Sequence, residues 1–145
     1  MALQDKKIMP PPWLAHREIE RYSIGWRMGY GEDYIDRFGD WLDILPEPKE
    51  DWEAYLWLAG SIGDAYFMMR NYGKSLGFFR KCCNIGETDN PFILLRLGEN
   101  YLELEDETNA TEFLLRAYML EGNKIFKEDW KYFQWLSKHV NLKRK

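Results

Sequence analysis

The feature that most constrains this chain is a residue pattern that returns after 35 positions. Gly63 is matched by Gly98, and Tyr66 is matched by Tyr101. The other matched pairs are Ile62 with Leu97, Ser75 with Ala110, Phe79 with Leu114, and Cys82 with Ala117. Two antiparallel helices approach closely only where the crossing residues are small and large apolar residues fill the space beside them. The repeat therefore predicts two similar pairs of helices.

Apolar residues at spacings of three and four predict about six helices in total. The predicted segments are 31–45, 50–70, 76–86, 91–104, 107–120 and 126–136. Pro46 and Pro48 would end the first helix, and 71–73 (Asn-Tyr-Gly) reads as a turn. Asn90 before Pro91 is a helix start, because the side chain caps the first turn and proline fits its first position.

The composition agrees with an all-α fold. The chain has 17 leucines but one valine and three threonines, and strands favour β-branched side chains. Its 145 residues are 46% apolar and 30% charged, which is typical of one folded domain. Within a single domain 1–145 we expect an irregular aromatic N-terminal lid (1–30), a capping helix and the start of the next (31–55), two repeat units (56–122), and a C-terminal capping helix with a basic tail (123–145).

On the matched residues the sequence resembles the tetratricopeptide repeat (TPR) family. The unit of that family has a Leu-Gly pair, a tyrosine three residues later, and two small positions flanking an aromatic residue in its second helix. The resemblance covers residues 56–122 and implies an antiparallel array of helical hairpins. The chain departs from the family pattern at Glu87 and Gly122, where the family has proline, and at Ala59 and Leu94, where it has tryptophan.

The resemblance also implies a binding groove, because the first helix of each TPR unit lines a concave surface. The matching positions in this chain include Trp57, Asp64, Phe67, Phe92, Glu99 and Glu103. We expect an aromatic and apolar floor from which the three carboxylates project, and a partner segment that is basic and partly apolar. The alternative is that the chain's own N-terminal segment covers Trp57 and Phe67.

The net charge of −4 conceals alternating blocks along the chain. Residues 1–30 carry +2, 31–65 carry −8, 66–86 carry +4, 87–112 carry −7, and 113–145 carry +5. These blocks are either solvated helix faces or negative surfaces for a basic partner. The overall acidity gives no reason to expect nucleic-acid binding. The chain also has no apolar run of about 18 residues, so we expect no membrane span and a cytoplasmic location.

We find no pattern that predicts a catalytic site, a metal site or a cofactor. His16 and His139 have no recognisable partner, and Cys82 holds a small packing position of the repeat, which predicts a buried and inert thiol. The acidic run at 103–107 lacks the glycine turn and the ligand alternation of a calcium loop. An enzyme working through Glu32, Asp33 or Asp36 beside the Arg27 loop is a remote alternative.

The segment Ser23–Tyr34 is similar to the N-terminal region of small bacterial TPR-like proteins, some of which resemble antitoxin or immunity proteins. This similarity implies a non-enzymatic binding protein. The leading hypothesis is a bacterial immunity protein that neutralises a basic toxin by direct binding, with charge and aromatic anchors matching the two surfaces. A TPR-type adaptor or chaperone-like scaffold for another protein is the alternative.

Overall fold

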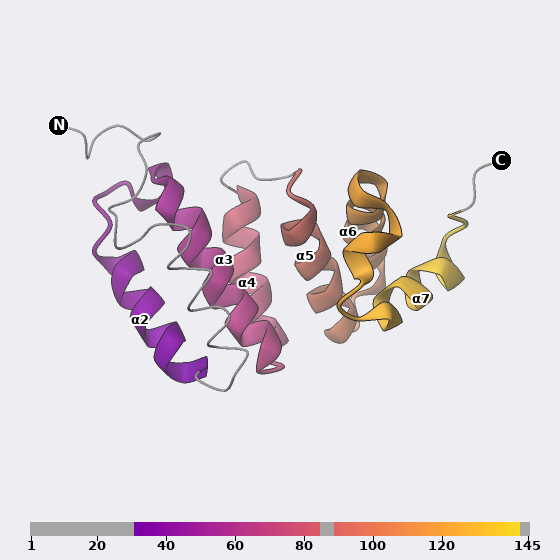
Figure 1. The fold of residues 1–145 in the computed structure, drawn as a ribbon, viewed down its shortest axis with the longest axis horizontal. Helices are drawn as coiled ribbons and strands as arrows, with labels where there is room; N and C mark the ends of the chain where they lie inside the picture. The colour runs from indigo at the N-terminus through magenta and orange to yellow at the C-terminus, as the bar shows by residue number, and fades with distance from the viewer. Residues whose placement is uncertain (1–30, 85–88, 143–145) are drawn as a thin grey trace. The chain divides into compact units, whose positions relative to one another are not determined.

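The computed structural model describes residues 31–84 and 89–142, with side chains described from residue 35 onward. In this part of the chain all regular secondary structure is helical, which confirms the all-α prediction. The α-helices, labelled in Figure 1, are α2 (Gly31–Asp43), α3 (Glu53–Met68), α4 (Tyr72–Asn84), α5 (Pro91–Glu103), α6 (Glu107–Glu121) and α7 (Trp130–His139). Two short 3₁₀ helices, η3 (Lys49–Asp51) and η4 (Gly122–Phe126), precede α3 and follow α6. The lid expected at 1–30 lies outside the described residues.

The helix ends follow from local side chains. Asn90 caps α5 by accepting hydrogen bonds from the amides of Phe92 and Ile93, and Pro91 occupies the first helical position as predicted. Asp106 caps α6, and Asp129 caps α7. Gly122 ends α6 with a φ of 72°, which confirms the helix end predicted there.

The turn expected at 71–73 lies earlier in the chain. α4 already begins at Tyr72, because Asn71 caps it by accepting a hydrogen bond from the amide of Lys74 at 3.2 Å. The left-handed residue of the turn is Arg70, with a φ of 62°, and not Gly73. The prediction of a turn over residues 71–73 was therefore wrong, because the turn precedes Tyr72 and the Asn71 side chain caps the helix that follows it.

The pair α3–α4 and the pair α5–α6 share several contacts at matched positions. Tyr66 stacks on Phe78 with ring centroids 5.9 Å apart, and the equivalent rings of Tyr101 and Phe113 are 5.6 Å apart. A cation lies over the second ring in both pairs, from Lys81 in the first and Arg116 in the second. The left-handed residues between the helices, Arg70 and Glu105, are also 35 positions apart. The matched residues thus make the same kinds of ring and cation contact in each of the two helix pairs.

The two matched glycines lie where the helices of each hairpin cross. A Cβ atom on Gly63 would lie 2.9 Å from the ring of Phe79, and one on Gly98 would lie 2.6 Å from Leu114. Both distances are too short for a side chain, so each close approach requires glycine at this position. This is the packing that the sequence predicted for these positions.

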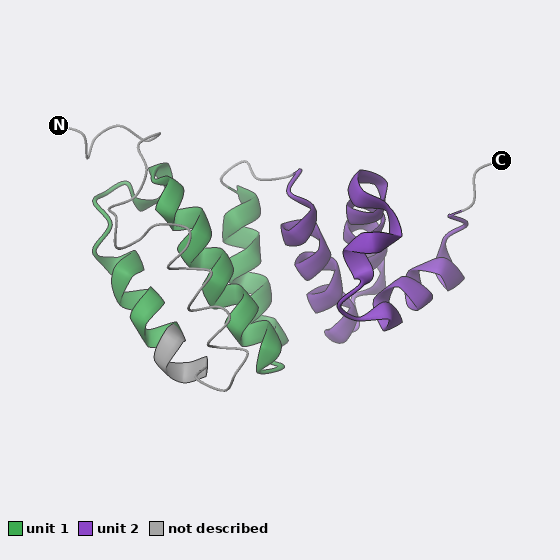
Figure 2. Ribbon diagram, viewed as in Figure 1, with its two compact units in different colours: residues 1–85 green, residues 86–145 purple. Residues whose placement is uncertain are grey.

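The chain divides into two compact units, residues 1–85 and residues 86–145 (Figure 2). In the first unit α2 packs on α3, and α3 packs on α4, around buried Leu58 and Phe79. In the second unit α5 packs on α6, and η4 and α7 pack on α6, around buried Leu97, Leu114 and Leu136. The expectation of a single domain stays a prediction.

Candidate protein-binding site

The six residues predicted to line a groove fall into two sets of three. Trp57, Asp64 and Phe67 lie on α3 in the first unit, and Phe92, Glu99 and Glu103 lie on α5 in the second. All six are therefore on the first helix of a hairpin, as the repeat predicted.

In the first unit the two aromatic residues are half-buried. Phe67 meets the ring of Tyr72 edge-on, with centroids 5.7 Å apart. Asp64 is buried, with 7% of its surface exposed. The expectation that Asp64 projects from a groove floor is therefore wrong.

In the second unit Glu99 is also buried, with 2% of its surface exposed. Its Oε1 atom accepts a hydrogen bond from Nη1 of Arg96 at 2.7 Å, so a fully buried guanidinium accompanies the carboxylate. Burial raises the pKa of Glu99 from 4.5 to about 7, and the Arg96 charge opposes this rise without cancelling it. Glu99 therefore does not project from a floor either, because its partner holds it inside the unit.

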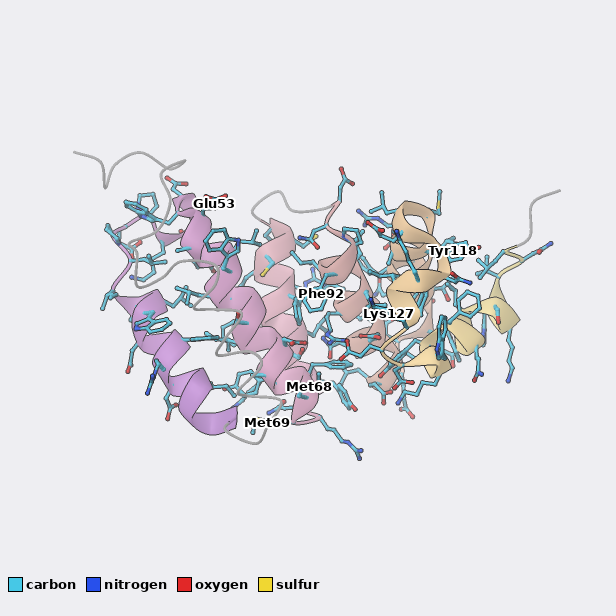
Figure 3. All side chains as sticks on the ribbon, viewed as in Figure 1. Glu53, Met68, Met69, Phe92, Tyr118 and Lys127 are labelled. Atoms are coloured by element: carbon cyan, nitrogen blue, oxygen red, sulfur yellow. The ribbon has the colours of Figure 1, made fainter. Side chains whose placement is uncertain are left out.

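Glu103 and Phe92 are tied to their neighbours more loosely. Glu103 accepts a hydrogen bond from the Tyr132 hydroxyl at 3.0 Å, and Nζ of Lys131 lies 3.2 Å from the same oxygen. Phe92 is 36% exposed on α5 (Figure 3), and the Arg96 guanidinium lies 5.0 Å from its ring centroid. Of the six predicted residues, Phe92 is thus the most accessible, and a binding role for all six stays a prediction.

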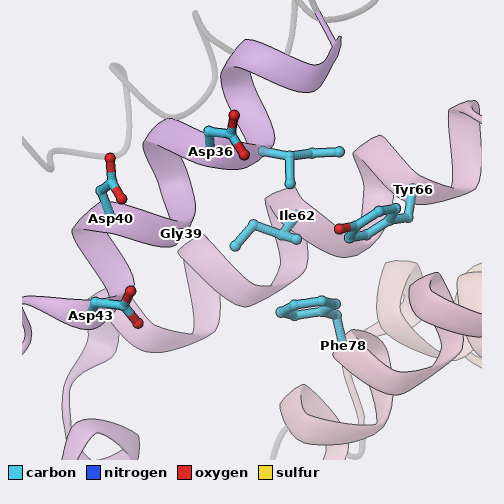
Figure 4. Close-up of a pocket in the computed structure, with 8 residues that line it drawn as sticks. Asp36, Gly39, Asp40, Asp43, Ile62, Tyr66 and Phe78 are labelled. Carbon is cyan, nitrogen blue, oxygen red and sulfur yellow. The ribbon is translucent and has the colours of Figure 1, made fainter.

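A surface that the sequence reading missed lies in the first unit, where a pocket of about 530 Å³ opens beside α2 (Figure 4). The lining residues are Ile35, Asp36, Gly39, Asp40 and Asp43 from α2, Ile62 and Tyr66 from α3, and Phe78 from α4. Ile62, Tyr66 and Phe78 supply an apolar floor with two stacked rings. Asp36, Asp40 and Asp43 are exposed and supply an acidic edge. We call these three residues the α2 acidic row.

The α2 acidic row had a signal in the sequence. Asp36, Asp40 and Asp43 follow one another at spacings of four and three, which places them on one face of a helix. Gly39, between them, leaves space, because a Cβ atom there would meet no atom within 4 Å. The sequence reading used the apolar face of this helix and considered Asp36 only as a catalytic candidate.

The charges around the pocket are asymmetric. The three carboxylates come from α2, whereas α4 brings two lysines to the floor rings. Nζ of Lys74 lies 5.4 Å from the Tyr66 centroid, and Nζ of Lys81 lies 4.9 Å from the Phe78 centroid. A cationic group would therefore bind beside the carboxylates at the α2 edge, and an apolar group would pack on the rings of the floor.

The residues considered for other chemistry have structural roles. Cys82 is fully buried, as predicted, and its sulfur lies 3.8 Å from the carbonyl oxygen of Leu56. Asp106, from the acidic run at 103–107, caps α6. Among the described side chains, at residues 35–84 and 89–142, no three His, Cys, Asp or Glu residues gather as a metal site would require. The side chains of Glu32 and Asp33 lie outside the described residues, so the enzyme alternative built on them is not tested.

Comparison with models of known protein families finds no match for this chain, and comparison with curated proteins finds none either. None of the helices in the described part combines the length and the apolar character needed to cross a membrane.

Proposed function

We propose that this chain is a non-enzymatic binding module for a basic protein, and most specifically a bacterial immunity protein that neutralises a basic toxin by covering it. The observation that carries this proposal is the α2 acidic row standing over an apolar, aromatic floor. Such a surface accepts a basic residue with an apolar or aromatic neighbour, which is a common anchor of protein interfaces. The acidic block of −8 over residues 31–65 adds long-range attraction to the same unit.

The equivalence of the two hairpins favours a second form of this function. Repeated hairpins present their first helices in series in TPR-like proteins, and adaptors of that kind bind extended segments. In this form the chain is an adaptor or chaperone-like scaffold, and Phe92 is the exposed anchor in the second unit. The two forms share a basic partner and differ in whether that partner is toxic when unbound.

The partner is sought by co-purification with the tagged full-length chain from its native host, followed by binding measurements with the purified partner. We expect a small basic protein whose affinity falls as salt rises, because exposed charges are screened. Asp36→Asn with Asp40→Asn should weaken binding about tenfold. The matched control is Glu50→Gln with Glu53→Gln, which changes the net charge equally at exposed sites away from the pocket.

The outcomes separate the alternatives. Equal affinity of the two variants would remove the pocket from the interface. If the chain restores growth of cells that express the partner, the immunity form is supported. A partner that is harmless when expressed alone supports the adaptor form, and an acidic partner contradicts both.

A further inference from the structure

The second unit contains one guanidinium shared by two carboxylates. Nη1 of Arg96 donates to Glu99 at 2.7 Å, and Nη2 lies 3.2 and 3.1 Å from the two carboxylate oxygens of Glu128. The side chains of Arg96 and Glu99 are 1% and 3% exposed, whereas the side chain of Glu128 is 43% exposed. Two members of this triad are therefore shielded from water and the third reaches it.

When both carboxylates are ionised, the triad has two negative charges and one positive charge. An uncompensated charge is unfavourable where water is excluded, and a proton on the buried carboxylate removes it. Burial is the largest cause of the raised pKa of Glu99, at about 7, and Glu128 and Asp129 act in the same direction. The geometry and this pKa place the proton on Glu99 in the neutral range.

The charge balance at Glu99 is set mainly by the members of the triad. Arg96 comes from the same helix, and Glu128 and Asp129 come from the segment between η4 and α7. α6 buries apolar residues in this unit, namely Ala110, Leu114 and Ala117. One turn after Glu99, Glu103 is engaged by Lys131 and Tyr132.

Glu128 occupies a position that matters for α7. It lies just before Asp129, whose side chain caps α7 by accepting from the amide of Lys131. The contact between Arg96 and Glu128 therefore fixes the start of α7 against α5. The hydrogen bond between Tyr132 and Glu103 is a second tie between the same two helices.

We propose that Arg96, Glu99 and Glu128 form a proton-controlled latch that fastens the start of α7 to α5. With Glu99 protonated, the charge of Arg96 is available to Glu128 and the latch is closed. When Glu99 loses its proton, two carboxylates compete for one guanidinium. Glu128 then turns into water, because it is the exposed member of the triad, and the start of α7 loosens. This inference does not depend on the proposed function.

The test is amide hydrogen exchange of α7 in the full-length chain at pH 6 and pH 8, corrected for the intrinsic pH dependence of exchange. We expect about tenfold faster corrected exchange at pH 8 in the wild type. In Glu99→Gln the corrected exchange rates at pH 6 and pH 8 should agree within about twofold, because glutamine has no proton to lose. Glu128→Gln should exchange at pH 6 about as fast as the wild type does at pH 8.

His139 is the competing explanation within α7, because its Nε2 atom lies 3.8 Å from Oε1 of Glu107 and this contact is an ion pair only when the ring is protonated. The control is His139→Gln, which should retain the wild-type pH dependence. Loss of the dependence in that variant, or its persistence in Glu99→Gln, would overturn the latch. Carbon-13 NMR of the Glu99 carboxyl in the wild type tests it without any variant, and an inflection near pH 4.5 would overturn it too.

Discussion

The two hairpins share one packing frame and differ in the polar groups that they bury. At the positions where α5 has Arg96 and Glu99, α3 has Ser61 and Asp64. At the position where α4 has Ser75, which donates to the carbonyl of Gly63 at 2.7 Å, α6 has Ala110. In both hairpins a glycine and a large apolar residue lie where the helices approach closely, whereas the buried polar groups differ and distinguish the two units.

The largest expected effect comes from Glu99, the buried carboxylate of the second hairpin that Arg96 accompanies. The pKa of Glu99 is raised, so between pH 4.5 and about 7 the folded chain keeps a proton that the unfolded chain releases. The stability of the second unit should therefore fall as pH rises through that range and level off above it. The upper limit of the loss is on the order of 3 kcal/mol.

Urea unfolding at pH 5 and pH 8 measures this loss, and Glu99→Gln should remove it. The matched control, Glu112→Gln on the exposed face of α6, should lose as much unfolding free energy between pH 5 and pH 8 as the wild type does. An equal pH dependence of the unfolding free energy in both variants would show that Glu99 is not the source of this dependence.

The crossing glycines should differ in their tolerance of a methyl group. Gly98→Ala would bring Cβ within 2.9 Å of the backbone nitrogen of Leu114, so backbone has to move, and we expect a loss of about 2 kcal/mol. For Gly63→Ala the three nearest atoms to the new Cβ are side-chain atoms of Phe79 and Phe78, and we expect a loss of about 1 kcal/mol. Chemical denaturation measures both variants.

Gly77→Ala is the control for the crossing glycines. A Cβ atom at this α4 position would meet nothing within 4 Å, so the better helix propensity of alanine should raise stability by up to about 1 kcal/mol. If Gly98→Ala is as stable as Gly77→Ala, the close approach of α5 and α6 at Gly98 does not require glycine.

Ser75→Ala makes the first hairpin more like the second, and it removes the buried hydrogen bond to Gly63. We expect a loss of about 1 kcal/mol in the free energy of unfolding. The control is Ser137→Ala, whose hydroxyl bonds to Gln134 at an exposed site, and it should change stability by no more than about 0.5 kcal/mol. A neutral Ser75→Ala would mean that the two hairpins are interchangeable at this position.

The smallest effect tests the feature that the hairpins share most closely. Arg70 and Glu105 have φ values of 62° and 66°, which glycine adopts without a steric penalty. Arg70→Gly and Glu105→Gly should each stabilise the chain by about 0.5 kcal/mol, whereas Glu112→Gly inside α6 should destabilise it by about 1 kcal/mol. Thermal unfolding compares the three, and opposite signs at 70 and 105 would break the equivalence of the turns.

The sequence predicted the helices and the hairpin crossings because both depend on residues that are close along the chain or matched by the repeat. Gly63, Gly98 and their large neighbours carry that information directly. The sequence misplaced the turn before α4, because Asn71 and Arg70 form it without the glycine that marks most turns.

The candidate site was harder to predict, since exposure depends on partners distant in sequence. Glu99 matched a groove position, yet Glu128, which follows α6 in the chain, completes the triad with Arg96. Arg96, three residues before Glu99, was the local signal of an ion pair. The pocket beside α2 requires the packing of three helices, which no spacing within α2 reveals.

The proton held by Glu99 also has a calorimetric consequence. Near pH 6 unfolding of the second unit releases this proton to the buffer, because the carboxyl returns to its ordinary pKa in water. The measured heat of unfolding then includes the heat with which the buffer takes up a proton. Scans in imidazole and in phosphate, which both buffer near this pH but take up a proton with different heats, should therefore differ in enthalpy at the same pH. That difference, divided by the difference between the two buffer heats, gives the number of protons released on unfolding.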